Sequence, residues 1–174
     1  AVNRRFTSIN ARAYIITQSL KKMKKEDREI ALNPSGFRVS GSGRPVDIST
    51  IDETDEAVYN TIFYKEIPYV KAGMDETIIV TYSPKYRAYQ RRIRDAQIER
   101  ARKIIDTGSK VRRGRNENDP CRFIKKTHMT SEGEVAKKYV CELDESKITD
   151  EERYDGFYAV ITNLEDDPRE IIRV

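Results

Sequence analysis

The sequence has few of the residues that most often build catalytic and metal sites. Its 174 residues include one histidine, His128, no tryptophan, and two cysteines, Cys121 and Cys141. A Ser-His or Cys-His nucleophile pair would have to use His128, and no motif of that kind surrounds it. Zinc ligands normally come in close pairs such as C-x2-C, a spacing that these three residues lack. The sequence therefore argues against a triad hydrolase and a zinc site, and favours two reduced, buried thiols.

Glycine-rich loops and long apolar runs are also missing. Gly41-Ser42-Gly43 lacks the third glycine of a dinucleotide-binding loop, and no Walker-type loop ending in Gly-Lys occurs. No apolar run approaches the roughly 20 residues that span a bilayer, and no apolar signal core follows the N-terminus. We expect a cytoplasmic protein with neither a membrane partner nor a small-molecule substrate.

Charge is abundant but unevenly spread. The net charge is +4, with 36% charged residues. Residues 84–115 contain 12 Lys/Arg and 3 Asp/Glu, a local charge of +9, whereas residues 142–174 contain 4 and 11, a local charge of −7. Such asymmetry is typical of an element that faces a polyanion beside an acidic, solvated one.

Apolar periodicity and turn residues predict a mixed α+β fold. Ser83 and Pro84 have the pattern of an N-cap and first helical residue, and Thr149 with Glu152 has that of a capping box. Residues 40–56 and 110–120 are expected loops. The expected strands are residues 11–20, 59–70, 77–82, 122–127, 138–143 and 157–161, with the fourth and fifth paired, and the helices are 21–32 and 84–106, with helix starts at 149 and 168.

Carboxylates cluster at three places in the chain, residues 52–56, 150–152 and 165–167. Paired carboxylates can hold Mg²⁺ through oxygen ligands. Acidic runs in polar loops are more commonly solvated surface, and Asp155 before Gly156 is most simply a turn residue. No catalytic or metal-binding residue is assigned to this chain.

The helix over residues 84–106 and the loop after it form the best functional surface. We expect one apolar side on this helix, formed by Tyr86, Tyr89, Ile93, Ala101, Ile104 and Ile105. Arginine presents planar donors that suit phosphate oxygens, and clustered loop arginines indicate an anionic partner. The candidate DNA-binding residues are Arg87, Arg91, Arg92, Arg94, Arg100, Arg102, Lys103, Lys110, Arg112, Arg113 and Arg115.

Three segments, residues 10–20, 78–105 and 154–174, together resemble insertion-sequence transposases of the DDE class. The most specific is Asp155-Gly156-Phe157, which leads through a strand to Thr162-Asn163. It resembles the family's approach to the helix that carries the catalytic Glu. The second segment resembles the strand, serine and basic helix of the family's insertion.

The resemblance implies part of an RNase H-like core with a β-rich insertion that carries one long basic helix. It assigns residues 1–20 to the core, 21–153 to the insertion, and 154–174 to the return strand and helix start. In the family, three carboxylates bind two Mg²⁺ ions for attack on phosphate. The resemblance places two of them before Ala1 and the third after Val174, so we expect a fragment that is inactive alone and holds no cofactor. DNA contact by the insertion is implied, with weak affinity.

Two functions compete. The first is a transposase fragment that acts in DNA recombination, and the second is a free-standing nucleic-acid-binding or scaffolding module without enzymatic ancestry. Separately, the alternative to DNA contact by the basic helix is that its arginines pair with the acidic residues 142–174. A homo-oligomer stays open in both. The core-plus-insertion interpretation also predicts that the strands 11–20 and 157–161 lie near one another.

Overall fold

The computed structural model describes residues 14–71, 73–108, 111–112, 114, 116–128 and 139–172. The fold is mixed α+β, as predicted. The chain forms two compact units. We call Ala1–Ala88 with Gly156–Val174 the sheet unit, and Tyr89–Asp155 the hairpin unit.

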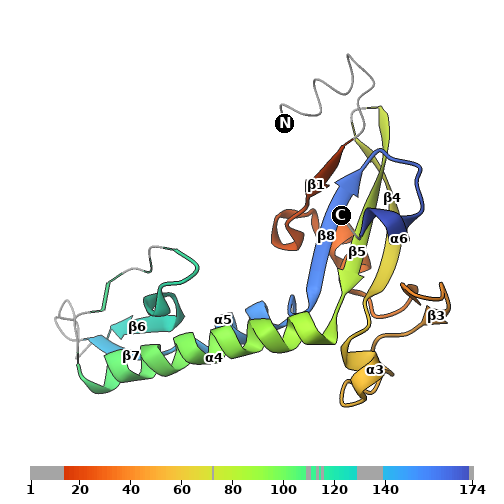
Figure 1. Ribbon diagram of the computed structural model, residues 1–174. Helices are drawn as coiled ribbons and strands as arrows, with labels where there is room; N and C mark the ends of the chain where they lie inside the picture. Colours follow the sequence, from red (N-terminus) through yellow and green to blue (C-terminus); the bar gives the residue numbers. More distant parts are fainter. Residues whose placement is uncertain are drawn as a thin grey trace. The chain divides into compact units, whose positions relative to one another are not determined.

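Six antiparallel strands make up the sheet unit, in the order β1-β8-β5-β4-β2-β3 (Figure 1). The neighbours β1 and β8 come from opposite ends of the chain, with Ile16 opposite Ile161. This pairing confirms that the two end strands lie together. The strand bounds are β1 Ile15–Thr17, β2 Phe37–Val39, β3 Pro45–Val46, β4 Phe63–Lys71, β5 Met74–Tyr82 and β8 Phe157–Thr162.

Helices cover both faces of this sheet. On one face, the buried residues Ile67, Ile78 and Ile161 lie opposite each other in adjacent strands. The 3-10 helix η1 (Leu20–Lys22) and helix α2 (Lys25–Leu32) belong to this side, where Lys65 of β4 donates to the end of α2. On the other face, Ile171 of α6 (Pro168–Ile171) packs on Tyr64 and Ile79. The short helix α3 (Glu56–Tyr59) begins at the end of the expected loop 40–56, and the strand expected from residue 59 begins only at Phe63.

Helix α4 spans Pro84–Asp106, the range that the sequence predicts. The Ser83 hydroxyl accepts a hydrogen bond from the Tyr86 N–H at 3.3 Å, which confirms the predicted N-cap. Gly108 follows the helix with a φ of 61°, a left-handed conformation that suits glycine.

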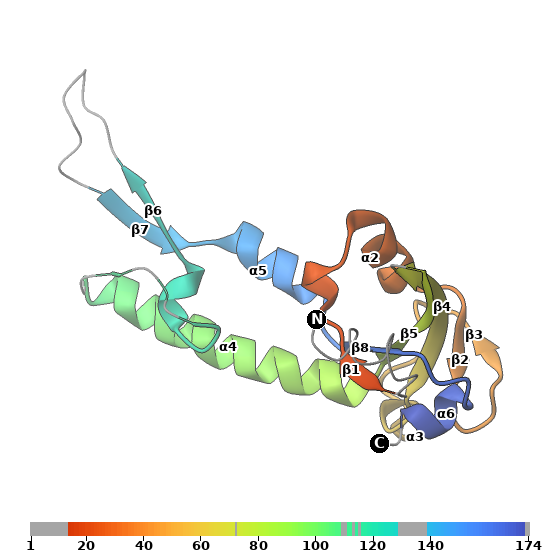
Figure 2. The same ribbon diagram turned by 90° about the horizontal axis from the view of Figure 1, so that it is seen from above.

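The rest of the hairpin unit is the 3-10 helix η2 (Pro120–Phe123), the strand pair β6 (Ile124–His128) and β7 (Tyr139–Leu143), and helix α5 (Glu145–Glu152). The predicted pairing of β6 with β7 is confirmed and is antiparallel, and the residues that connect the two strands, 129–138, lie outside the described residues. Phe123 and Ala101 are completely buried and pack with Ile148 of α5. Figure 2 shows α5 running beside α4.

The predicted capping box at Thr149 is wrong. Helix α5 begins at Glu145, and the carboxylate of Asp144 accepts a hydrogen bond from the Lys147 N–H. Thr149 therefore lies inside the helix. The domain ranges that the resemblance implies, 1–20, 21–153 and 154–174, stay a prediction, but β4 and β5 pair in the same sheet as β1 and β8.

Candidate nucleic-acid interface

The buried side of α4 matches the predicted apolar side only in part, at Ala101 and at the partly buried Ile104 and Ile105. Tyr86, Tyr89 and Ile93 are 38%, 50% and 39% exposed. The buried positions instead include Arg94, Gln97 and Ala101, which lie three and four residues apart on one face. The prediction fails for Tyr86, Tyr89 and Ile93 because Arg94 and Gln97 occupy the buried side of that part of the helix.

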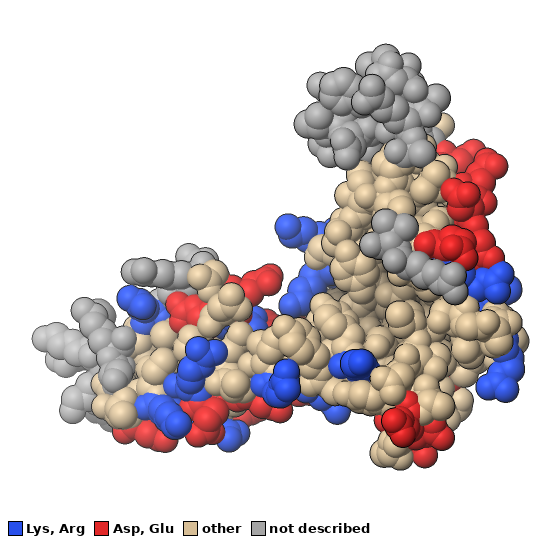
Figure 3. Space-filling model, in the orientation of Figure 1, with Lys and Arg blue, Asp and Glu red and all other residues tan. Residues whose placement is uncertain are grey.

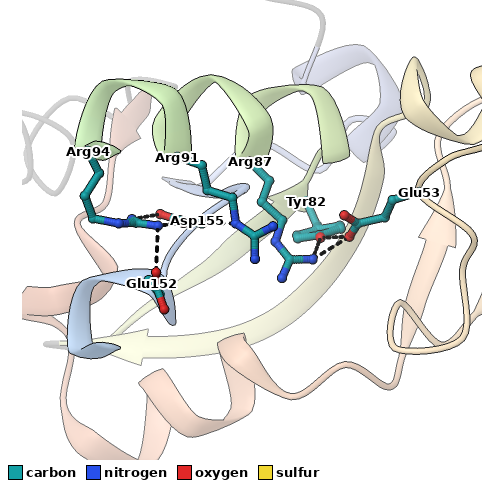
Figure 4. A network of polar contacts seen from close by, with 7 residues as sticks. All are labelled: Glu53, Tyr82, Arg87, Arg91, Arg94, Glu152 and Asp155. Carbon is teal, nitrogen blue, oxygen red and sulfur yellow. Dashed lines mark hydrogen bonds and ion pairs between the residues drawn. The ribbon is translucent and has the colours of Figure 1, made fainter. Parts of the chain in front are cut away.

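Arg94 is buried because Asp155 neutralises it. One guanidinium nitrogen (NH1) donates to Oδ1 of Asp155 at 2.7 Å, and the other (NH2) donates to Oδ2 at 2.5 Å (Figure 4). Both residues are 5% exposed, and Glu152 adds a contact at 3.4 Å. The hydrogen bonds to Asp155 raise the pKa of Arg94 above its ordinary value. Asp155 is thus an ion-pair partner as well as the residue before the turn, and Arg94 is withdrawn from the surface.

A second, partly buried pair connects three elements of the hairpin unit. The Arg122 guanidinium donates to Oε1 of Glu151 in α5 and to Oε1 of Gln97 in α4, the latter at 2.9 and 3.2 Å. The guanidinium also stacks over the Phe123 ring, 4.1 Å from its centroid. Glu151, which the sequence places in a solvated acidic run, therefore holds Arg122 in place.

In the sheet unit, Arg87 is engaged in a similar way. Its NH1 group donates to Oε1 of Glu53 at 2.6 Å and to the Tyr82 hydroxyl at 3.1 Å, and that hydroxyl donates to Glu53 (Figure 4). Burial, with the hydrogen bond to Glu53, raises the pKa of Tyr82 to about 12. Glu53, which the sequence places in a solvated acidic run, instead holds a helix residue.

The other basic residues of α4 are exposed. Arg91 is half exposed, with Nε 4.0 Å from Asp155. Lys103 lies 3.7 Å from Glu99, one turn before it. Arg92 lies over the Tyr89 ring at 5.9 Å, and Arg100 donates to the Ala96 carbonyl. No ion pair joins Arg92, Arg100 or Arg102 to a carboxylate of the described part of the chain.

These exposed cations do not form one stripe, because successive residues of a helix are rotated by about 100°. On the face shown in Figure 3, blue and red side chains alternate over the region of α4. Asp95, Glu99 and Asp106 are the interspersed acids. Arg112 is exposed, whereas Lys110, Arg113 and Arg115 lie outside the described residues. The structure thus separates arginines that are held by carboxylates from arginines that are available to an anion.

The described residues also bear on metal binding, thiol chemistry and membrane insertion. Within the described ranges, no three His, Cys, Asp or Glu side chains gather in a way that could hold a metal ion. Cys121 and Cys141 are free thiols, each half-buried, and burial raises the pKa of Cys121. Among the described helices, none has the length and apolar character needed to cross a membrane.

Comparison with known proteins identified no relative of this chain. No family model matches the chain, and neither the curated proteins nor the solved structures contain a match to it.

Proposed function

We propose that the chain binds the DNA backbone through exposed arginines of α4, as part of a transposase of the DDE class. The resemblance of residues 78–105 and 154–174 to that family supplies the class. The observation that supports DNA contact is the sorting of arginines within the hairpin unit. Arg94 and Arg122 pair with nearby carboxylates, while Arg92, Arg100 and Arg102 stay exposed and pair with no carboxylate of the described residues.

Phosphate binding suits these exposed side chains. A solvated guanidinium keeps its planar donors available for phosphate oxygens, and no buried ion pair must break first. Tyr89 lies beside Arg92 and is half exposed, so its ring is available for stacking against a sugar or base. Because the cations point in several directions and alternate with acids, we expect non-specific affinity, on the order of 10⁻⁴ to 10⁻⁶ M at physiological salt.

The proposal includes no DNA cleavage by this chain alone. The residues that carry the resemblance do not include the metal-binding carboxylates of the family, and Mg²⁺ belongs to the intact enzyme. Incubation with Mg²⁺ or Mn²⁺ and supercoiled DNA should leave the DNA unnicked. Metal-dependent nicking that disappears when a carboxylate of this chain is mutated would contradict the assignment.

A second candidate is a scaffolding or nucleic-acid-binding module without enzymatic ancestry. The exposed side chains of Tyr89 and Ile93, one turn apart on α4, favour it, because exposed aromatic and aliphatic groups are typical of protein interfaces. In this case the same helix surface contacts a protein, and its arginines contribute little to DNA affinity.

The deciding experiment removes three charges from α4. The variant Arg92→Gln/Arg100→Gln/Arg102→Gln is compared with the wild type by fluorescence anisotropy on a labelled DNA duplex over a series of salt concentrations. Each phosphate contact contributes close to 0.9 to the slope of log K against log salt. We expect the slope to fall by about two to three units.

The matched control is Lys22→Gln/Lys24→Gln/Lys25→Gln in the sheet unit, which removes the same charge from exposed positions. It should lower affinity less and change the slope by under about one unit. If the two triple variants lower DNA affinity and the salt slope equally, DNA binding depends only on net charge, and the proposal is wrong. Melting curves should show both variants folded, because none of the six residues forms an ion pair within the described structure.

A further inference from the structure

A cavity of about 500 Å³ in the hairpin unit is strongly basic. Among the described residues, the charged ones that line it are Arg112, Arg122, Lys126, Lys147 and one carboxylate, Asp144. The cavity lies at the side of β6 and the start of α5, and none of its lining residues belongs to α4. It is therefore separate from the proposed α4 surface.

Two of the four cations are partly used by the protein itself. Arg122 is bound by Glu151 and Gln97, so its charge is already balanced. Lys126 Nζ donates to the Val111 carbonyl and lies 4.9 Å from the centre of the Tyr139 ring. An ammonium group has three donors, so two remain for a ligand.

The carboxylate in the wall is also engaged. Asp144 accepts hydrogen bonds from the Ser146 hydroxyl at 2.7 Å and from the Lys147 N–H at 3.1 Å. The bond from Ser146 lowers the pKa of Asp144, so the group stays charged at neutral pH. Asp144 therefore caps α5. Because its carboxylate repels an anion, an anion in the cavity would lie near Lys126, Lys147 and Arg112.

Arg112 and Lys147 form no ion pair of their own among the described residues, although the Lys147 charge attracts the Asp144 carboxylate and helps to lower its pKa. Neither side chain forms a hydrogen bond or ion pair with another residue of the described ranges, and Lys147 is half-buried. Lys147 is partly withdrawn from solvent, where an arriving opposite charge stabilises a cation, whereas Arg112 is exposed. After the Arg122–Glu151 pair is set aside, three cations and one carboxylate leave an excess positive charge in the cavity wall.

We propose that this cavity binds a phosphate monoester, with Arg112, Lys126 and Lys147 as its donors. Arginine suits two oxygens of one phosphate, and lysines supply compact charge. The volume falls within the roughly 300 to 1,000 Å³ of small-ligand sites, which is room for a nucleotide and not only for one phosphate. A free nucleotide and the 5′-phosphate end of a DNA strand share this chemistry. The inference does not depend on DNA binding by α4.

The first experiment titrates the whole chain with adenosine 5′-monophosphate, with adenosine as the probe that lacks the charge. Isothermal calorimetry and amide shifts in ¹H–¹⁵N spectra report binding. We expect saturable binding of the nucleotide, with shifts at Arg112, Lys126 and Lys147, and none for adenosine. Equal binding of both compounds, or binding of neither, would overturn the proposal.

Charge-removing variants locate the site. Arg112→Gln and Lys147→Gln should each weaken nucleotide binding about 10- to 100-fold, the effect of one charge-assisted hydrogen bond. The control is Lys125→Gln on the same strand β6, since its ammonium lies 3.7 Å from Glu142 and does not line the cavity. Loss of affinity as large in the control as in the site variants would reject the cavity. Lys147→Arg keeps the charge and should retain most affinity, which separates binding from folding.

The two phosphate sources are separated with oligonucleotides. A 5′-phosphorylated strand should compete with the nucleotide more strongly than the same strand with a 5′-hydroxyl if the cavity takes DNA ends. Equal competition assigns the cavity to free nucleotides. The α4 triple variant should bind the nucleotide as the wild type does, so failure of the α4 proposal and failure of this one give different results.

Discussion

Arg94 and Asp155 form a bidentate ion pair although they lie 61 positions apart in the sequence, and both side chains are buried. Arg94 lies in α4, and Asp155 is the last residue of the hairpin unit. The pair therefore fastens the chain that leaves α5 onto the long helix. A buried pair of this kind contributes little over an apolar pair, but breaking it leaves one unpaired charge in the interior.

Replacing one partner should therefore be costly. We expect Arg94→Met to lower the free energy of unfolding by about 3 to 5 kcal/mol, because the buried Asp155 would keep only the half-exposed Arg91, 4.0 Å away, as a cation. Urea denaturation measures the change. The double variant Arg94→Met/Asp155→Leu should recover most of the loss. The control Lys103→Gln, which removes an exposed pair with Glu99, should cost under about 0.5 kcal/mol. A loss under about 1 kcal/mol for Arg94→Met would show that the pair is not closed in solution.

Gly156 should tolerate no side chain. Its φ is 84°, and a Cβ atom there would lie 2.7 Å from the Tyr82 ring and 3.1 Å from the Ser83 carbonyl oxygen. Left-handed strain costs about 1 to 2 kcal/mol, and overpacking adds about 1 to 3 kcal/mol. We expect Gly156→Ala to lose about 2 to 5 kcal/mol in urea denaturation.

Gly43→Ala is the matched control for this prediction. Gly43 also has a positive φ, 68°, but nothing lies within 4 Å of the added Cβ. It should lose only the backbone term, about 1 to 2 kcal/mol. Equal losses at the two glycines would mean that the contact with Tyr82 carries no cost.

Lys65 should make stability depend on pH in the alkaline range. Its Nζ donates to the carbonyls of Ile30 and Asn33 at the end of α2, at 2.7 and 2.6 Å. Burial lowers the pKa of Lys65 from 10.5 to about 8, against the opposing effect of Asp47. Between about pH 8 and 10.5 the unfolded chain binds this proton more strongly than the folded chain. The contribution of Lys65 to stability should therefore rise with pH across that window.

The comparison with Lys65→Met isolates this effect from the other titrating groups. The variant should be less stable by about 1 to 3 kcal/mol at neutral pH, because buried carbonyls lose their donor. Urea denaturation at pH 7, 8.5 and 10 should show that the difference between wild type and variant grows. A difference that shrinks as pH rises would mean that the folded chain holds the Lys65 proton more tightly than the unfolded chain.

The start of α5 can be tested by two alanine substitutions. Asp144→Ala removes the N-cap carboxylate and should cost about 0.5 to 2 kcal/mol. Thr149→Ala should change stability by under about 0.5 kcal/mol, because Thr149 is an exposed residue inside the helix. The reverse order of the two losses in thermal or urea unfolding would restore the capping box at Thr149.

Local signals explain what the sequence predicts well. Ser83 and Pro84 at one end and Gly108 at the other mark the bounds of α4, and each acts within its own turn of the chain. The buried side of that helix cannot be read in the same way. Arg94 resembles Arg91 and Arg92 in sequence, and only a carboxylate 61 residues away makes it an interior residue.

Helix α5 shows the same limit at short range. Asp144 and Thr149 both fit the pattern of an N-cap, so local propensity does not separate them. With the helix starting at Glu145, Ile148 lies inside α5 and packs against Phe123 and Ala101, and this tertiary contact favours the earlier start. The candidate site follows this rule as a whole: the sequence identifies the basic residues, and distant partners determine which of them stay exposed.

The antiparallel pairing of β5 with β8 has a consequence during protein synthesis. Thr77 of β5 lies opposite Thr162 of β8 in the sheet. The ribosome therefore synthesises β5 well before the strand that pairs with it. At about 5 to 20 residues per second, the delay between Tyr82 and Thr162 is roughly 4 to 16 s. During it the hairpin unit, which is continuous in sequence, can fold, while β5 shows an open edge to other nascent chains. Slow translation after β5 should therefore raise the demand for chaperones at this stage.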